Sequence, residues 1–301
     1  MKKITLTSFL MFFAIVAFAQ TYTTPNTGVN WTLDDIAAAS PATITVSGSE
    51  YTLHENLEIA EADAVSISTD ITLLIDVDLR VTVFGSFTVD ANAVSITAVD
   101  ETMPYDGFRF EEFSVIDIQN ATIEYGGGLR VLTETFTLNN STLSHNVSGV
   151  STGAVVSLSR GMPQITNNTF TLNETPAVSS AANSEVSAYI FNNHIEGNNQ
   201  SNSNRPQINM GSTMANEPLQ IIQNTIIGDP ALEMVGGIAV ANLVGGNINT
   251  IIDDNIVQGN RYGITIVGPS TSAEITNNVI EDNNTQGNPN LGGSGININT
   301  S

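Results

Sequence analysis

The stretch Ile165-Thr-Asn-Asn-Thr-Phe170, followed 25 residues later by Ile190-Phe-Asn-Asn-His-Ile195, decides the fold. Its pattern is aliphatic, any, Asn-like, polar or small, any, aliphatic. Seven copies occur, at 118–123, 138–143, 165–170, 190–195, 221–226, 251–256 and 275–280. Successive copies begin 20 to 31 residues apart. That interval is too short for a strand–helix–strand unit plus a second strand and suits one turn of a β-solenoid.

Amide columns accompany the repeat and predict sharp corners. The third position is always amide or acidic, with Asn120, Asn140, Asn167, Asn192, Gln223, Asp253 and Asn277. A further polar column follows three residues after the last aliphatic position, with Asn146, Asn173, Asn198, Asp229 and Asn283. Asparagine tolerates the left-handed backbone of a corner, and its amide can bond to the copies above and below. We interpret both columns as stacked corners rather than as rows of ligands.

The N-terminal residues 1–19 are predicted to be a signal peptide. Lys2 and Lys3 precede an apolar run over 4–16, and small residues at 17–19 suit a signal peptidase. The run is shorter than the roughly 20 residues that a spanning helix needs. We therefore expect a secreted protein without membrane insertion.

Residues 20–43 are predicted to form an N-terminal cap, and residues 44–301 the solenoid. Thr32 can cap a short helix whose apolar side, Leu33, Ile36 and Ala37, would plug the open end of the core. No Pro/Gly-rich linker divides the chain, which predicts one domain. We also expect a monomer. The strand-like segment 295–299 ends two residues before the last residue, so we expect the solenoid to be truncated at its C-terminus.

Composition excludes several classes of protein. The 301 residues contain no cysteine and carry 30 Asp and Glu against 8 Lys and Arg. A disulfide scaffold and a Cys-based zinc site are therefore excluded. Removal of residues 1–19 leaves six arginines and a net charge of about −24. Such a chain is a poor ligand for nucleic acid.

Together, the seven copies resemble right-handed parallel β-helix proteins, the superfold of pectate lyases and polygalacturonases. A second likeness lies in Asp106-Gly-Phe-Arg-Phe110 followed by Ile123-Glu-Tyr-Gly-Gly-Gly128. It is similar to the "DGIRF…IEYGG" stretch of secreted bacterial β-helix proteins, many of which carry a type IX sorting domain. The resemblance implies an all-β, right-handed parallel β-helix of roughly ten coils. It also implies an address outside a Gram-negative bacterium, secreted or on the outer cell surface.

The catalytic motifs of those enzymes are incomplete in this chain. Polygalacturonase-like enzymes have Asn-Thr-Asp, Asp-Asp, Gly-His and Arg-Ile-Lys sets, of which only Asp253-Asp254 has a counterpart here. Two adjacent carboxylates could act as acid and base if their pKa values were driven apart. The same pair could instead be calcium ligands. Their place in the repeat favours ordinary corner residues.

Lyase chemistry requires an arginine or lysine that removes a proton, with calcium bridging acidic side chains to the substrate. Ile75, Val77, Leu79, Val81 and Val83 alternate with polar residues and predict one strand. On its outward face, Arg80 lies beside Asp76 and Asp78, and this is the best local group for a lyase. A surface ion pair is the simpler interpretation.

Aromatic residues that could stack on sugar rings are few. They are Trp31, Tyr105, Phe108 and Tyr125, and we interpret them as core or cap packing. A strongly acidic surface repels acidic polymers, whereas neutral glycans meet no such barrier. From the fold, the address and the incomplete catalytic motifs we expect a secreted or cell-surface module that binds or displays toward extracellular polysaccharide. A polysaccharide lyase or glycoside hydrolase is the alternative.

Overall fold

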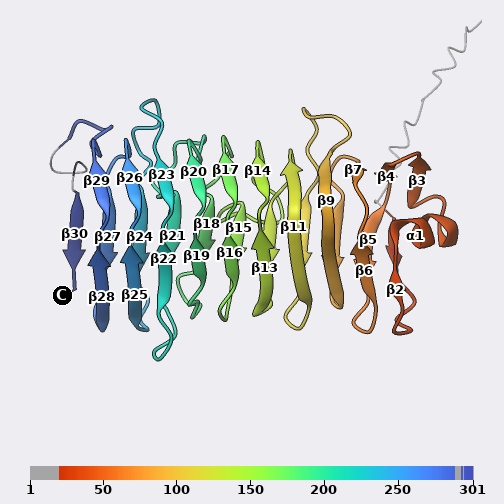
Figure 1. Ribbon diagram of the computed structural model, residues 1–301, viewed down its shortest axis with the longest axis horizontal. Helices are drawn as coiled ribbons and strands as arrows, with labels where there is room; N and C mark the ends of the chain where they lie inside the picture. The colour runs from red at the N-terminus through yellow and green to blue at the C-terminus, as the bar shows by residue number, and fades with distance from the viewer. Residues whose placement is uncertain (1–19, 289–292, 294, 301) are drawn as a thin grey trace, which may run out of the picture.

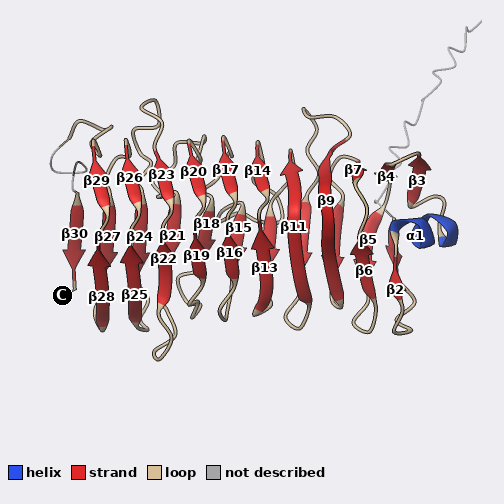
Figure 2. Ribbon diagram, viewed as in Figure 1, coloured by secondary structure: helices blue, strands red, loops and turns tan. Residues whose placement is uncertain are grey.

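The computed structural model describes residues 20–288, 293 and 295–300, so the predicted signal peptide lies outside the described residues. The chain forms an elongated stack of short strands (Figure 1), and strands dominate its secondary structure (Figure 2). Nearly every strand pairs in parallel with the strand one turn further along the chain. Among the described strands, only β3 and β4 pair antiparallel. This all-β arrangement of long parallel sheets is compatible with the solenoid that the repeat predicts.

Three ladders of strands run along the stack. The first is an 11-stranded sheet. Its strands are β1 (Thr21–Thr23), β5 (Asn56–Ile59), β8 (Arg80–Val83), β10 (Gly107–Phe110), β12 (Leu129–Val131), β15 (Val156–Leu158), β18 (Val178–Ser180), β21 (Ile208–Met210), β24 (Ile238–Ala241), β27 (Ile264–Val267) and β30 (Ile296–Asn299).

The second and third ladders meet along a bend and share the long strands β9 (Ser86–Ala98) and β11 (Val115–Glu124). The second also contains β2 (Asn30–Trp31), β6 (Ala64–Ile67), β13 (Thr135–Asn139), β16 (Gln164–Thr166), β19 (Tyr189–Phe191), β22 (Leu219–Ile222), β25 (Ile248–Asp253) and β28 (Thr271–Thr276). The third also contains β3 (Ile44–Ser47), β4 (Glu50–Leu53), β7 (Ile71–Ile75), β14 (Thr142–Ser144), β17 (Thr169–Thr171), β20 (His194–Glu196), β23 (Thr225–Ile227), β26 (Ile256–Gln258) and β29 (Val279–Glu281).

Aliphatic columns form the core between the ladders. In the third ladder Ile123, Leu143, Phe170, Ile195 and Ile226 stack in register, and each is at most 1% exposed. Full burial of one such side chain stabilises the fold by about 1.5–3 kcal/mol. The last aliphatic position of the repeat therefore holds the coils together.

A helix, α1 (Leu33–Ala39), lies at the N-terminal end of the stack (Figure 1). Thr32 caps it, and the side chain of Asp35 bonds back to the Thr32 N–H, so the predicted helix start is confirmed. Leu33 and Ile36 are buried, as its apolar side predicts.

The segment before α1 is fastened to the next coil by Asp63, whose side chain is buried. Its carboxylate accepts N–H donors from residues 26–29 at 2.8–3.1 Å. Burial opposes ionisation, but hydrogen bonds from the Thr24 hydroxyl and from the backbone N–H groups of Val29, Asn26 and Thr27 outweigh it. They lower the pKa of Asp63 to about 2.

The Asp106–Phe110 and Ile123–Gly128 stretches are explained by close packing. Tyr105 and Phe108 are buried, which confirms that both are core residues. The ring of Tyr105 lies against Gly126, where an added Cβ would come within 2.1 Å of the ring. A Cβ on Gly127 would come within 1.8 Å of the Asp106 carbonyl oxygen. These glycines allow two coils to approach each other at this corner.

Residues of the first predicted corner column adopt the predicted left-handed backbone. Positive φ occurs at Asn120, Asn140, Asn167, Asn192, Gln223 and Asn277. For the second column this prediction is wrong, because positive φ falls one residue earlier, at His145, Leu172, Gly197 and Asp282. The predicted bounds of the copy at 251–256 begin one residue too early. Ile252 pairs with Ile221, and Asp254 rather than Asp253 has positive φ. Doublets of aliphatic residues at both ends of this copy make its register ambiguous in the sequence, and burial of Asn255 fixes it.

The predicted strand over 75–83 is also wrong. Strand β7 ends at Ile75 and β8 begins at Arg80. Between them Asp78 has a φ of 60°, so the chain turns there. The alternation of apolar and polar residues continues across this corner, which is why it resembles a single strand.

Candidate functional site

Buried amides form a continuous ladder at the bend between the second and third ladders of strands. The side chains are those of Asn168, Asn193, Asn224 and Asn255, which are buried, and of Asn278, which is half-buried at the end of the ladder. In each of these four contacts, Nδ2 donates to the Oδ1 of the next coil at 2.8–3.0 Å. Each Nδ2 of the five also donates to a backbone carbonyl one coil back. These amides are bonded on both sides, so the residue that follows the first predicted corner column stacks from coil to coil.

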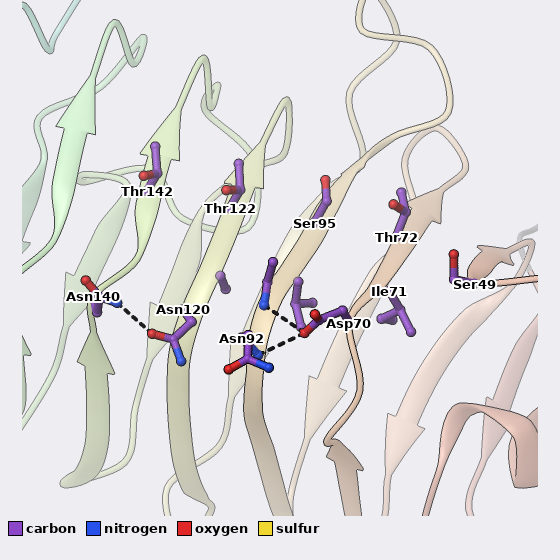
Figure 3. Close-up of a pocket in the computed structure, with 13 residues that line it drawn as sticks. Ser49, Asp70, Ile71, Thr72, Asn92, Ser95, Asn120, Thr122, Asn140 and Thr142 are labelled. Atoms are coloured by element: carbon purple, nitrogen blue, oxygen red, sulfur yellow. Dashed lines mark hydrogen bonds between the residues drawn. The ribbon is translucent and has the colours of Figure 1, made fainter.

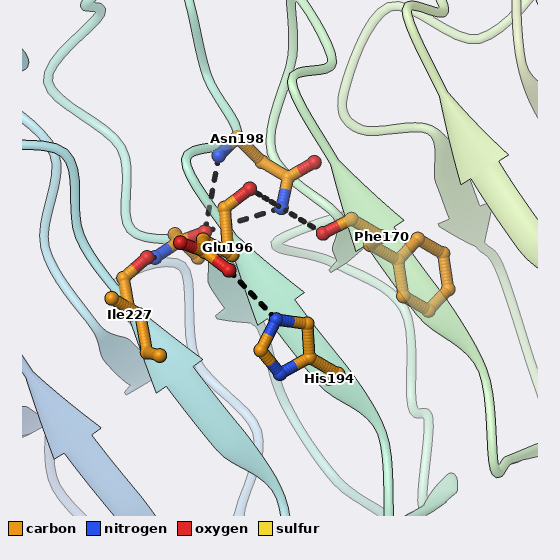
Figure 4. Close-up of polar contacts among 6 residues, drawn as sticks. Phe170, His194, Glu196, Asn198 and Ile227 are labelled. Carbon is orange, nitrogen blue, oxygen red and sulfur yellow. Dashed lines mark hydrogen bonds and ion pairs between the residues drawn. The ribbon is translucent and has the colours of Figure 1, made fainter.

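A second buried ladder follows the third ladder of strands. It contains Asn146, Asn173, Asn198, Gln207, Asn260 and Asn283. Figure 4 shows Asn198 donating to the Phe170 carbonyl at 2.8 Å. The sequence predicted Asp229 in this column, and that prediction is wrong. The longer side chain of Gln207, from a loop, bonds to Asn198 and Asn260 in its place. Both ladders are internal, so they hold the coils together and offer nothing to a ligand.

On the coils that precede the first of these ladders, the surface along the same bend contains a groove of about 480 Å³. It crosses five successive coils and runs along the bend (Figure 3). It is lined by Ser49, Asp70, Ile71, Thr72, Asn92, Ala93, Val94, Ser95, Asn120, Ala121, Thr122, Asn140 and Thr142. We call this feature the bend groove.

Hydroxyl groups line one side of the bend groove in register. Thr72, Ser95, Thr122 and Thr142 occupy paired positions on β7, β9, β11 and β14. Paired strands lie about 4.8 Å apart, so a hydroxyl recurs at that spacing. The row continues beyond the groove through Thr169, His194 and Thr225. His194 bonds there to Glu196 at 2.8 Å (Figure 4).

Amide groups line the other side. The Nδ2 of Asn140 donates to the Oδ1 of Asn120 at 2.6 Å. Asp70 is the one charged residue in the lining, and its carboxylate accepts the N–H groups of Asn92 and Ala93 at 2.9 Å. The bend groove therefore presents hydroxyl and amide groups with little free charge. Such groups can exchange hydrogen bonds with the hydroxyls of a neutral sugar.

The three residues of the predicted lyase group are not joined to one another. Asp76 bonds to Nδ1 of His54 at 2.7 Å, and the Nε2 of His54 contacts the Thr45 hydroxyl at 2.9 Å. Arg80 instead bonds to Asp106 at 2.8 Å. Asp78 lies in the turn between β7 and β8.

Asp253 and Asp254 lie at the bend, far along the chain from the bend groove. Asp253 accepts hydrogen bonds from the Thr276 hydroxyl at 2.6 Å and from Asn277 at 2.8 Å, which lower its pKa. Asp254 accepts one from Gln223 at 3.1 Å. Within the part of the chain that the structure describes, no group of three or more His, Asp or Glu side chains could hold a metal ion.

Comparison with protein-family models, curated proteins and solved structures found no match. Within residues 20–288, 293 and 295–300, no helix is long and apolar enough to cross a membrane.

The residues of the bend groove were not identified from the sequence. Ser and Thr are ordinary residues on the outward face of a strand. The sequence nevertheless contains a pattern from which the hydroxyl row could have been predicted. The fifth position of the repeat is Thr in the first three copies, Thr122, Thr142 and Thr169, and a repeated hydroxyl at one position predicts a hydroxyl row.

Proposed function

We propose that the protein is a secreted right-handed parallel β-helix that binds a neutral extracellular polysaccharide along the bend groove. In this proposal residues 20–43, with α1, cap a stack of roughly ten coils. The protein acts outside a Gram-negative bacterium or on its outer surface. The observation that carries the proposal is the lining of the groove, in which Asp70 is the one charged residue and hydroxyls occupy the same register position on four successive coils.

An extended glycan fits this lining for two reasons. The groove runs across five coils, so it contacts several sugar units rather than one. Its groups repeat at about 4.8 Å, which is close to the length of a sugar unit, so successive rings can meet equivalent donors and acceptors. The net charge of −22 sets no electrostatic barrier against a neutral chain, whereas it repels a polyanion.

Binding is tested by affinity electrophoresis of residues 20–301 in gels that contain neutral or acidic polysaccharides. Thr122→Val keeps the shape and strand preference of the side chain but removes its hydroxyl from the groove. Loss of one hydrogen bond, about 1 kcal/mol, predicts roughly fivefold weaker binding. Thr225→Val is the matched control, because Thr225 occupies the same row outside the groove.

Retardation by a neutral polymer that Thr122→Val weakens and Thr225→Val preserves supports the proposal. Retardation that both variants leave unchanged would place the site elsewhere. Incubation of each polymer with the protein, followed by size-exclusion chromatography, separates binding from catalysis. A shortened polymer would make the chain a polysaccharide lyase or glycoside hydrolase and direct attention to Asp76, Asp78, Arg80, Asp253 and Asp254.

A further inference from the structure

Two arginines lie side by side on the outward face of the first ladder of strands. Arg109 on β10 and Arg130 on β12 are directly paired in register. Paired residues on neighbouring strands lie about 5 Å apart, and like charges at that position repel. The arrangement is unexpected in a chain with 30 acidic and only eight basic residues.

The other arginines of the described chain all have partners. Arg80 bonds to Asp106, Arg109 to Glu111, Arg160 to Glu112, Arg205 to the carbonyls of Thr152 and Gly153, and Arg261 to Gln286 and Asn204. Arg130 is the exception, since within the described residues its guanidinium has no hydrogen-bond or ion-pair partner. Its positive charge is therefore uncompensated by direct contact.

The surroundings of Arg130 offer further free donors. Glu111 occupies the Nε and one Nη of Arg109, with a shortest contact of 2.5 Å, and leaves other N–H groups of that guanidinium unused. On the far side of Arg109 the paired residue is Thr82. Its hydroxyl also makes no hydrogen bond within the described residues. Three neighbouring strands thus present donors on one face.

A loop covers the next residue of this row of paired residues, beyond Arg130. The residue paired with it on β15, Ser157, is buried beneath the loop that carries Ser151 and Gly153. The hydroxyls of Ser157 and Ser151 are 2.7 Å apart. Arg130 therefore lies against the side of a loop and is itself half-buried, which limits the water that can screen its charge.

We infer that Arg130, Arg109 and Thr82 form a binding site for a single oxyanion, a carboxylate, sulfate or phosphate group of a small molecule or of a glycan. A guanidinium binds such groups through parallel N–H donors. An oxyanion between two arginines also removes their mutual repulsion. The overall negative charge disfavours a polyanion, so the site selects an isolated anionic group. This inference is independent of the bend groove.

The test is isothermal titration of the secreted protein with sodium sulfate, sodium phosphate and sodium glucuronate, each at an ionic strength matched with sodium chloride. We expect at least one anion to bind and Arg130→Gln to weaken it at least tenfold. Arg109→Gln should weaken it as well. Arg160→Gln, which removes an arginine paired elsewhere with Glu112, should not. Thr122→Val should also leave anion binding intact.

The preferred anion identifies its source. Tighter binding of glucuronate indicates a uronic acid, and tighter binding of sulfate or phosphate indicates an ester; both support the inference. Without added anion, Arg130→Gln should unfold at the same temperature as the wild type or higher, because it removes a like-charged neighbour. Failure of all three anions to bind, or equal binding by Arg130→Gln, would overturn the inference.

Discussion

Replacement of Asn193 by alanine removes one amide from the middle of the first buried ladder. The side chain is 2% exposed. Its Oδ1 accepts the backbone N–H of Asn168 at 2.9 Å and the Nδ2 of Asn168 at 3.0 Å. Its Nδ2 donates to the Ile165 carbonyl and to the Oδ1 of Asn224, both at 2.9 Å.

The expected loss of stability follows from these four contacts. A typical hydrogen bond contributes about 1 kcal/mol net, so four predict a loss of about 4 kcal/mol. Water cannot replace the amide without opening the bend, because its partners are also buried. Loss of the van der Waals contacts of the amide adds to this value. The total lies at the upper end of what single substitutions produce.

The assay is equilibrium unfolding in urea, followed by circular dichroism and by tryptophan fluorescence from Trp31. Because coils of a solenoid can unfold separately, both signals are needed to establish a single transition. Asn192→Gly is the matched control. It removes the adjacent exposed amide at a position with φ of 52°, which glycine adopts freely, so stability should change by less than about 1 kcal/mol. A loss below 1 kcal/mol for Asn193→Ala would refute the assignment of stability to the ladder.

Three further predictions concern other parts of the molecule. Asp63→Asn should expose residues 20–31 to protease at pH 7, as seen by mass spectrometry, because the amide nitrogen would replace one acceptor oxygen and face either the N–H of Asn26 or those of residues 27–29. In the wild type the pKa of Asp63 is lowered from 3.8 to about 2, so its contribution to stability is full above about pH 5. It should be lost as the pH falls from 3.8 through 2, and protection that persists below pH 2 would contradict this. Gly127→Ala should abolish soluble expression, since its Cβ would lie 1.8 Å from the Asp106 carbonyl oxygen, whereas Gly48→Ala, with no atom within 4 Å, should cost only about 1 kcal/mol for its positive φ. The midpoint of thermal unfolding should rise with sodium chloride and further with millimolar calcium, because 30 carboxylates repel one another, and a midpoint unchanged in both would show that this repulsion is unimportant.

The repeat predicted the stacking of coils because each aliphatic position faces the same core column. Ile165 and Ile190 pair directly, as their equal places in the copies require. The asparagines of the first corner column were predictable for the same reason, since a left-handed residue recurs at this corner in successive coils. The predicted register of the copies was wrong only at 251–257, where two adjacent aliphatic residues at each end allow two registers. Burial of Asn255 decides between these registers.

The candidate site could not be predicted equally well, because it depends on contacts between coils of unequal length. Asp76 and Arg80 are near in sequence, yet the turn between them gives each a partner from another coil, His54 and Asp106. Likewise, the pairing of Arg109 with Arg130 depends on the particular length of one coil. Local spacing cannot reveal such neighbours.

The two amide ladders also determine how the molecule bears force. In both, the bonds between amides run along the stacking axis and link each coil to the next. Tension along that axis loads the interfaces in series, so coils should detach one after another from an end. Tension across the axis instead acts on the covalent backbone of a single coil. The molecule should therefore behave as a rod that yields by peeling from an end, and the bend groove, which crosses five coils, should keep its shape until peeling reaches those coils.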